Sequence, residues 1–387
     1  MGDLNMAKSP FRQPDMNLGQ RLWQINWSFV LLISITASIG FGMLYSAANG
    51  NFDPWASRQM LRFVIGVFLM LIVAVIDIHV WLRYAYPIYL ISLLLLLVVE
   101  FSGTIGMGAQ RWIDLGVFTI QPSEIMKISI ILLLARYFYA SRLEDVSRIS
   151  HLLMPILLMV IPAVLIVRQP DLGTSVLLIA TGIAMLFVVG VRIWMFILGA
   201  FVTIGAIIPL WQFVLRDYQK ARLLTFINPE RDPLGAGYHI LQSKIALGSG
   251  GLFGKGFMGG SQSHLSFLPE KQTDFIFTML AEEFGLVGGL LLITLYILLL
   301  VYAFVMSLRC RSQFGRLIGI GVSTSFFLNV FVNIAMVMGL VPVVGMPLPL
   351  ISYGGTAMLT LMFSFGLLLC VYIHRDVQIS PGSADGD

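Results

Sequence analysis

Ionisable side chains gather beside apolar segments in this chain of 387 residues. Glu124 and Lys127 lie three residues apart in QPSEIMK, a spacing that puts both on one face of a helix. A carboxylate at such a place can act as a general base, and a nearby cation can stabilise a negatively charged leaving group. The candidate residues for such chemistry are Arg111, Glu124, Lys127, Arg168, Asp171, Glu270, Lys271 and Asp274.

Each candidate also has a purely structural interpretation. Glu124 and Lys127 could simply neutralise each other. Asp171 follows a proline and precedes an apolar run, so it could cap a helix. Asp274 could cap the helix predicted over 275–307 in the same way. Arg111 could anchor the chain at the level of lipid headgroups. The residue types alone leave these alternatives open.

Composition indicates the solvent in which these residues lie. The chain is 58% hydrophobic and 11% charged, with a mean hydropathy of +0.88, whereas soluble domains carry about 25% charged residues. So much apolar surface cannot fit in one core, and the excess must face lipid. The net charge of +4 is spread out, which argues against nucleic-acid binding. The two cysteines form no CxxC pair, so neither a zinc site nor a redox motif is indicated.

The apolar segments predict an all-α polytopic membrane protein with about ten transmembrane helices, because a bilayer core needs roughly 20 apolar residues per helix. We expect a single transmembrane domain over 27–376, flanked by tails at 1–26 and 377–387, with one long outer connection over 212–273. The predicted segments are 27–47, 60–76, 81–101, 122–140, 152–168, 171–190, 192–211, 275–307, 315–339 and 352–373.

Basic residues predict the orientation of these helices. Cytoplasmic connections carry an excess of lysine and arginine, which favours both termini inside the cell. The candidate site residues then all lie at the outer side, which predicts a polar cavity open to the outside. The inner segments hold Lys8, Arg12, Arg21, Arg83, Arg142, Arg148, Arg192, Arg309, Arg311, Arg316 and Arg375, and the short outer ones only Arg58, Arg111 and Arg168.

The long outer connection contains a glycine-rich stretch, GSGGLFGKGFMGG, in which GKGFMG matches the pattern G-x-G-x-x-G. We predict no nucleotide site there, because no strand precedes the match and no nucleotide pool exists outside the membrane. Glycines instead permit tight turns and close backbone approach. A flexible linker is the alternative.

Two further outer segments are unusual. YHILQSKIALG has an apolar and a polar face and lies in a connection with a basic excess, so it could lie on the membrane and attract an anionic amphiphile. A solvated surface helix is the alternative. GLVPVVGMPLPLISYGG is uncharged and carries three prolines, so it should be irregular and buried, either as a wall for a lipid tail or as a plug.

Together these motifs resemble the SEDS family, the shape, elongation, division and sporulation proteins of bacteria. The resemblance runs from about residue 25 to 376 and is closest to the elongation members. Gln272 departs from it, since many relatives carry histidine there, which puts a histidine-assisted proton relay in doubt. The matching segments are QRWIDLG…QPSEIMK, RQPDLGTS, FINPERDPLGAGYHILQSKIALGSGGLFGKG, FLPEKQTDFIFTMLAEEFGLVGG and GMPLPLISYGG.

The resemblance implies a peptidoglycan glycosyltransferase that polymerises lipid II at the outer face of the bacterial inner membrane during cell elongation. It implies an essential Asp274, a class B penicillin-binding protein as partner beside other elongation-complex membrane proteins, and a divalent cation, Mg²⁺ or Mn²⁺, without a nucleotide. On this basis Asp274 is the expected general base. Arg111, Lys127 and Lys271 would stabilise the departing pyrophosphate, with Glu124 orienting Lys127.

Two other functions remain open at this stage. A flippase for lipid II or another amphiphile would also need many spans, although the ionisable residues mark no path across the membrane and no inverted repeat is evident. A non-catalytic scaffold for wall-synthesis enzymes is the third interpretation.

Overall fold

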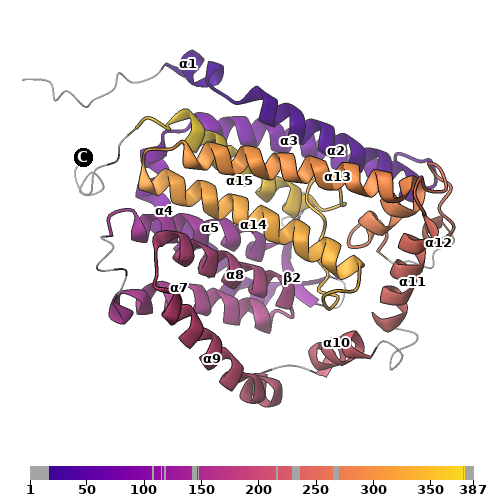
Figure 1. Ribbon diagram of the computed structural model, residues 1–387. Coiled ribbons are helices and arrows are strands. Elements are labelled where there is room, and N and C mark those ends of the chain that lie inside the picture. The colour runs from indigo at the N-terminus through magenta and orange to yellow at the C-terminus, as the bar shows by residue number, and fades with distance from the viewer. Residues whose placement is uncertain are drawn as a thin grey trace, which may run out of the picture.

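The computed structural model describes residues 17–106, 109–114, 116, 119–141, 146, 148–214, 217–228, 236–264, 270–377 and 379. Long helices make up most of it (Figure 1), and every predicted apolar segment forms one. The helical membrane class is therefore confirmed. These helices are α2 (Trp27–Ala47), α3 (Ala56–Val75), α4 (Ile78–Ser102), α5 (Pro122–Phe138), α7 (Ile149–Arg168), α8 (Leu172–Val189), α9 (Ile193–Pro209), α13 (Ile276–Leu308), α14 (Gln313–Val337) and α15 (Gly355–Ile373).

Eight helices in the described part of the chain are long and apolar enough to cross a membrane, namely α2, α3, α4, α7, α8, α13, α14 and α15. The other two, α5 and α9, have 17 residues each and reach only about 26 Å at 1.5 Å per residue. α5 also carries three charged residues, Glu124, Lys127 and Arg136. The count of ten spans therefore stays a prediction.

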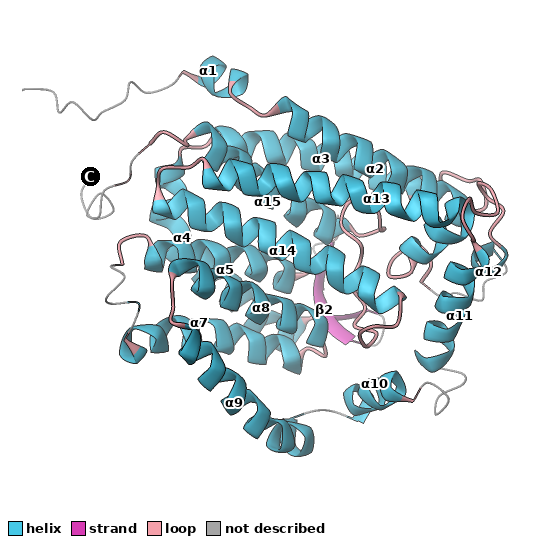
Figure 2. Ribbon diagram, in the orientation of Figure 1, coloured by secondary structure: helices cyan, strands magenta, loops and turns pink. Residues whose placement is uncertain are grey.

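A small antiparallel sheet adds the strands that the sequence did not predict. It has the order β1 (Thr104–Gly106), β2 (Ala109–Asp114) and β3 (Thr119–Ile120), and β2 is visible among the helices in Figure 2. The motif QRWIDLG thus begins as a strand that leads toward α5. Strands this short leave too little alternation to be recognised from sequence. The remaining elements are α1 (Leu18–Trp23), a π-helical turn (Leu210–Val214), α10 (Asp217–Ile227), α11 (Ala236–Ser249) and α12 (Ser261–His264).

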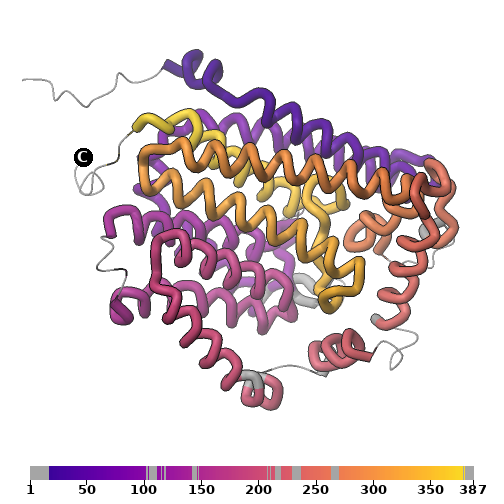
Figure 3. Tube along the Cα trace, viewed as in Figure 1, coloured from indigo at the N-terminus to yellow at the C-terminus, as the bar shows by residue number. Residues whose placement is uncertain are grey.

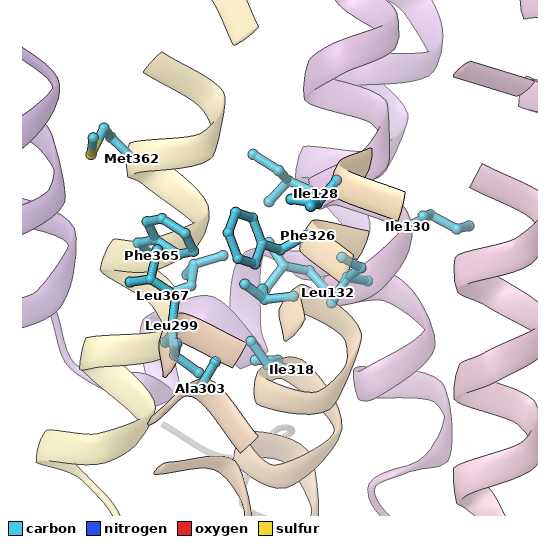
Figure 4. Close-up of a cluster of buried hydrophobic side chains, with 14 of the residues drawn as sticks. Ile128, Ile130, Leu132, Leu299, Ala303, Ile318, Phe326, Met362, Phe365 and Leu367 are labelled. Carbon is cyan, nitrogen blue, oxygen red and sulfur yellow. The ribbon is translucent and has the colours of Figure 1, made fainter. Parts of the chain in front are cut away.

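The buried core is formed largely by α5, α13, α14 and α15. Figure 4 shows Ile128, Phe326 and Phe365 facing one another from three of these helices. The rings of Phe326 and Phe365 meet edge to face, with centroids 5.2 Å apart. Because lipid tails are as apolar as these side chains, close packing rather than water exclusion holds such helices together.

Glycines bring α3 and α15 especially close. A Cβ on Gly366 would lie 2.7 Å from the side chain of Val73, and one on Gly66 would lie 2.8 Å from that of Met362. Small residues of this kind are typical of helix contacts in membranes. The two helices therefore form a tightly packed pair.

Three prolines inside α4 and α7 each remove the donor for the carbonyl four residues earlier. In every case a side chain of a neighbouring helix satisfies that carbonyl, as membrane depth requires. These contacts tie α4, α5 and α7 together. For Pro87, Arg136 donates to Arg83 O at 2.8 Å; for Pro155, Tyr137 donates to His151 O at 2.9 Å; for Pro162, Tyr89 donates to Leu158 O at 2.9 Å.

The two ends of the bundle differ. α1 and the end of α15 lie at one end, and α11 and α12 lie at the opposite end (Figure 1). This agrees with the prediction that both termini share one side and that the long connection lies on the other, although most of the predicted tails falls outside the described residues. α9 leads away from the other helices toward α10 (Figure 3).

This arrangement predicts which surfaces a membrane-impermeant thiol reagent can reach in intact spheroplasts. A cysteine in place of Phe253, which is 80% exposed beside α13, should be labelled. A cysteine in place of Arg311, exposed at the opposite end, should be labelled only after lysis. Background should be low, since Cys310 and Cys370 are buried. If only the Arg311 variant were labelled in intact spheroplasts, the predicted membrane orientation would be wrong.

Candidate functional site

A break in α13 organises the outer end of the bundle. Gly285 has φ 66° and ψ −162°, which interrupts the helix shortly after it begins. The part from 286 to 308 is still about 34 Å long and can cross a bilayer alone. The sequence predicted one continuous segment, and this break is a correction to it. The residues from 276 to 284 are therefore free to form a separate, buried half-helix.

The glycine-rich stretch docks on this break. Lys255 N donates to Glu282 O at 3.0 Å, and Leu286 N donates to Gly251 O at 2.9 Å. A Cβ on Gly254 would lie 2.1 Å from Glu283 O, so only glycine fits this approach. The prediction of close backbone approach is confirmed, and the flexible-linker alternative is wrong for residues 250–256.

Two carboxylates that sequence analysis overlooked fix this contact. Glu282 is fully buried, and its Oε1 accepts from Lys255 Nζ at 2.8 Å and from Gln262 N at 2.9 Å. Glu283 is also fully buried and accepts from the hydroxyl of Ser46 on α2. Charged groups at membrane depth are costly, so two adjacent glutamates inside an apolar segment were a signal that could have been read.

α11 covers the outer half of α13. Ser243 is fully buried and donates to Val337 O at 2.8 Å, so the helix is fixed to the end of α14. Its hydroxyl also lies 2.8 Å from that of Thr278 on α13. The buried face of α11 thus packs on protein, which neither the membrane-surface interpretation nor the solvated-helix interpretation anticipated.

Asp274 lies in the turn that precedes the half-helix. The backbone of this turn is held by Asn333 of α14, whose Nδ2 donates to Asp274 O at 3.1 Å and to Met346 O at 2.6 Å. Two more bonds come from the loop that follows α14. Ser352 Oγ donates to Thr273 O at 2.5 Å, and Tyr353 N donates to Gln272 O at 2.8 Å.

That loop, over 339–355, is irregular and largely buried, as predicted. Tyr296 donates to Pro349 O at 2.6 Å from α13, and Gln59 donates to Ser352 O at 3.0 Å from α3. Ile351 is fully buried, and a Cβ on Gly40 of α2 would lie 2.7 Å from its Cα. The part from 346 to 352 therefore packs inside the bundle as the plug interpretation predicts, and the use of the remaining loop as a wall for a lipid tail stays a prediction.

Asp274 does not cap α13. The N-cap residue is Phe275, and no side chain caps the helix, so that structural interpretation of Asp274 is wrong. Among the described residues, none donates a hydrogen bond to its carboxylate. Burial, and after it the neighbouring charge of Glu270, raise the pKa of Asp274 to about 7 against the opposing influence of Arg222 and Arg111. The group can therefore exchange a proton near neutral pH.

Arg111 and Asp171 both lie at the turn between α7 and α8. Arg111 Nε donates to Gln169 O at 3.1 Å, and the same guanidinium donates to Pro170 O, so it fixes the turn between α7 and α8 rather than reaching for headgroups. Asp171 caps α8 by accepting from Thr174 N at 3.2 Å, which confirms its structural interpretation. Arg111 is nevertheless close enough to Asp274 to influence its pKa.

Glu124 and Lys127 form the expected ion pair, with Nζ and Oε1 2.8 Å apart and both side chains nearly buried. Thr360 of α15 donates to the other oxygen of Glu124 at 3.3 Å. The pair therefore stands at the start of α5, beside α15. Its geometry agrees with a neutralising pair, and a role in chemistry stays a prediction.

The remaining candidates divide into two groups. Glu270 precedes Asp274 in the same turn, and its Oε2 accepts from Thr273 Oγ1 at 3.1 Å. Burial lowers the pKa of Lys271, against the opposing charge of Glu283. Arg168 lies apart, 66% exposed, with its Nε 3.4 Å from Glu100 Oε1. The structure thus brings Arg111, Glu270 and Asp274 together and leaves Arg168 outside.

A divalent cation would have to share its ligands with a bound molecule. Within the described ranges, no group of three or more histidine, cysteine, aspartate or glutamate side chains could hold a metal ion. Mg²⁺ is commonly bound by one or two carboxylates together with substrate phosphates. Glu270, in the turn before α13, is a carboxylate that fits that pattern.

Known proteins resemble the chain over nearly its whole length. A family model described as a cell cycle protein, that of FtsW, RodA and SpoVE, matches residues 21–377. The peptidoglycan glycosyltransferase MrdB of Escherichia coli (strain K12) is 44% identical over 347 residues, which are 89% of this chain and 93% of that relative.

Solved structures agree with this similarity. A chain from a structure described as "Structural coordination of polymerization and crosslinking by a peptidoglycan synthase complex" is 30% identical, with a TM-score of 0.78, covering 91% of this chain and 98% of that chain. The rod shape determining protein RodA of Thermus thermophilus is 29% identical, with a TM-score of 0.68, covering 91% and 97%.

The docking of the glycine-rich stretch can be tested by substitution. Gly254→Ala should lower the free energy of unfolding by about 1–3 kcal/mol, because its φ of +79° is strained for alanine and its Cβ would meet Glu283 O. Gly248→Ala is the matched control, since nothing lies within 4 Å of its Cβ. Thermal unfolding in detergent measures both. Equal stability of the two variants would mean that this contact is not formed.

Proposed function

The chain belongs to the family of FtsW, RodA and SpoVE, and on that basis we propose that it is a peptidoglycan glycosyltransferase of the bacterial inner membrane. Its substrate is lipid II, which it polymerises into glycan strands at the outer face during cell elongation. The observation that carries the chemistry is the enclosed carboxylate of Asp274, with a pKa of about 7, in the turn before α13.

Asp274 acts as the general base in this proposal. Glycan polymerisation requires a sugar hydroxyl to lose its proton while it attacks an anomeric carbon. A base is most effective when its pKa lies near the working pH, and it contributes about 10²–10⁴-fold to the rate. Burial and Glu270 bring Asp274 into that range, whereas an exposed aspartate would be too weak a base.

Cations stabilise the leaving pyrophosphate. Lys271 lies three residues before Asp274 in the same turn, so its ammonium is the first candidate for that charge. Arg111 already donates to two backbone carbonyls, so we assign it to positioning and to the positive field near Asp274. Lys127, held by Glu124, is the second candidate. A bound Mg²⁺ or Mn²⁺ would neutralise further phosphate charge, with Glu270 as its carboxylate ligand beside the substrate phosphates, because Asp274 must stay free to accept the proton.

The partner is a crosslinking enzyme of the wall. The solved chain with a TM-score of 0.78 comes from a peptidoglycan synthase complex that coordinates polymerization and crosslinking. We expect a class B penicillin-binding protein in that place, together with other membrane proteins of the elongation complex.

One assay separates this function from the alternatives. The purified protein is reconstituted in liposomes with labelled lipid II, and the products are resolved by size. Glycan polymer supports the glycosyltransferase. Transfer of intact lipid II between leaflets without polymer would support a flippase. If neither activity is detected with or without the partner, the scaffold function remains.

Asp274→Asn should separate chemistry from stability. Because Asp274 does not cap α13, the unfolding free energy should fall by less than about 1 kcal/mol. Its folded pKa is raised, so wild-type stability from this group is lost as pH rises through about 7, and the Asn variant should be at least as stable as wild type above that pH. Polymerisation should fall by at least about 100-fold, because Asn accepts no proton.

The matched control for this experiment is Asp53→Asn, an exposed aspartate between α2 and α3. It should retain wild-type polymerisation. Normal activity of a well-folded Asp274→Asn variant would assign the general base to another residue.

The Glu124–Lys127 pair can be tested by removing both charges. Glu124→Gln combined with Lys127→Met should fold, because no unpaired buried charge remains, whereas Lys127→Met alone leaves a buried carboxylate and should be less stable. We expect the folded double variant to lose polymerisation, since Lys127 also serves the pyrophosphate. Wild-type polymer yield from it would restrict the pair to a structural role.

A further inference from the structure

A hollow of about 360 Å³ opens between α4 and α7, and none of its lining residues takes part in the proposed chemistry. Two hydrogen bonds join its walls, one before and one after the residues of α7 that line it. Tyr89 donates to Leu158 O at 2.9 Å, and Gln169 Nε2 donates to Leu96 O at 2.7 Å. Its lining is entirely apolar: Leu93, Leu97, Val160, Ile161, Val164 and Leu165.

The hollow suits a hydrocarbon chain. Several of its lining side chains face outward from the bundle, and Val164 is 53% exposed. A space without polar partners does not hold ordered water, and its walls lose dispersion contacts if it stays empty. Both helices are long and apolar enough to span a membrane, so the neighbouring molecules at this depth are lipids.

Charged groups stand at the mouth of the hollow. Along α4, Leu93, Leu97 and Glu100 are spaced i, i+4 and i+7, so they share one face. Along α7, Ile161, Leu165 and Arg168 are spaced in the same way. At about 1.5 Å per residue, Glu100 lies roughly 10 Å along α4 from Leu93, and Arg168 lies equally far along α7 from Ile161. This distance fits a headgroup that stands above an acyl chain held by the lining.

The two charges are complementary to a zwitterion. Arg168 is 66% exposed, and its Nε lies 3.4 Å from Glu100 Oε1. The other oxygen of Glu100 is buried and has no hydrogen-bond partner among the described residues. The Glu100 side chain as a whole is 26% exposed beside Arg168, so its carboxylate can attract an ammonium group, while the exposed guanidinium can donate to a phosphate.

We propose that this hollow binds a zwitterionic aminophospholipid. One acyl chain fills the space between α4 and α7, the phosphate contacts Arg168 and the ammonium contacts Glu100. An anionic phospholipid without an amine would place negative charge beside Glu100 and bind less well. This lipid site does not use Asp274 and does not depend on the proposed polymerase activity.

Photo-crosslinking tests the proposal with the full-length protein in phosphatidylcholine nanodiscs. Two probes carry a diazirine on the acyl chain and differ only in having a phosphoethanolamine or a phosphoglycerol headgroup. Labelled peptides are identified by mass spectrometry. The phosphoethanolamine probe should label the segments 93–97 and 160–165 about fivefold more than the phosphoglycerol probe, which corresponds to one partly exposed ionic contact.

Variants distinguish the headgroup from the chain. Glu100→Gln should abolish or reverse the preference between the probes, and Val164→Trp should reduce labelling of these segments by both probes because it fills the hollow. Leu153→Trp is the matched control, because Leu153 is 67% exposed on α7 and does not line the hollow. It should label as wild type does.

Three outcomes would overturn the proposal. The first is equal labelling by the two probes, and the second is a preference that survives Glu100→Gln. The third is displacement of both probes by a polyprenyl pyrophosphate, which would assign the hollow to a lipid-linked substrate instead. Loss of lipid II polymerisation in any variant is recorded separately, because neither its presence nor its absence bears on probe selectivity.

Discussion

A backbone polar group that is freed at membrane depth must find its partner inside the protein, and this requirement shapes the irregular parts of the structure. At the break around Gly285, the freed groups of α13 pair with the glycine-rich stretch. The prolines of α4 and α7 are compensated by Arg136, Tyr89 and Tyr137 in the same way. In the described parts of α4, α7 and α13, neighbouring segments bind the irregular backbone and become rigid supports.

The same supports create the site. The half-helix before Gly285 and the plug loop after α14 enclose the turn that carries Asp274, and Asn333 bonds to both the turn and the loop. Partial burial withdraws water from the carboxylate, which disfavours its charged form and raises its pKa. The chemistry proposed for Asp274 thus follows from how the membrane helices are interrupted.

Local features of the sequence predicted the helices and the charged pairs well. The bounds of α2 agree with the predicted 27–47, because hydropathy alone defines a span, and Asp171 and the Glu124–Lys127 pair follow from spacing. The break at Gly285 and the role of Asn333 were missed. Both depend on contacts between residues that lie far apart in sequence, for example 59 positions between Asn333 and Asp274. No local periodicity carries that information.

The central claim is that Asp274 is a general base whose pKa is raised by burial and by Glu270. The pH dependence of kcat/KM for lipid II polymerisation tests it most directly, because it reports the pKa of the essential base in the free enzyme. The rate should rise with pH and level off above about 7, and Glu270→Gln should move the midpoint to lower pH by removing a charge that raises the pKa of Asp274. A midpoint that does not change in the Glu270→Gln variant, or a rate that falls as pH rises through 7, would contradict the account.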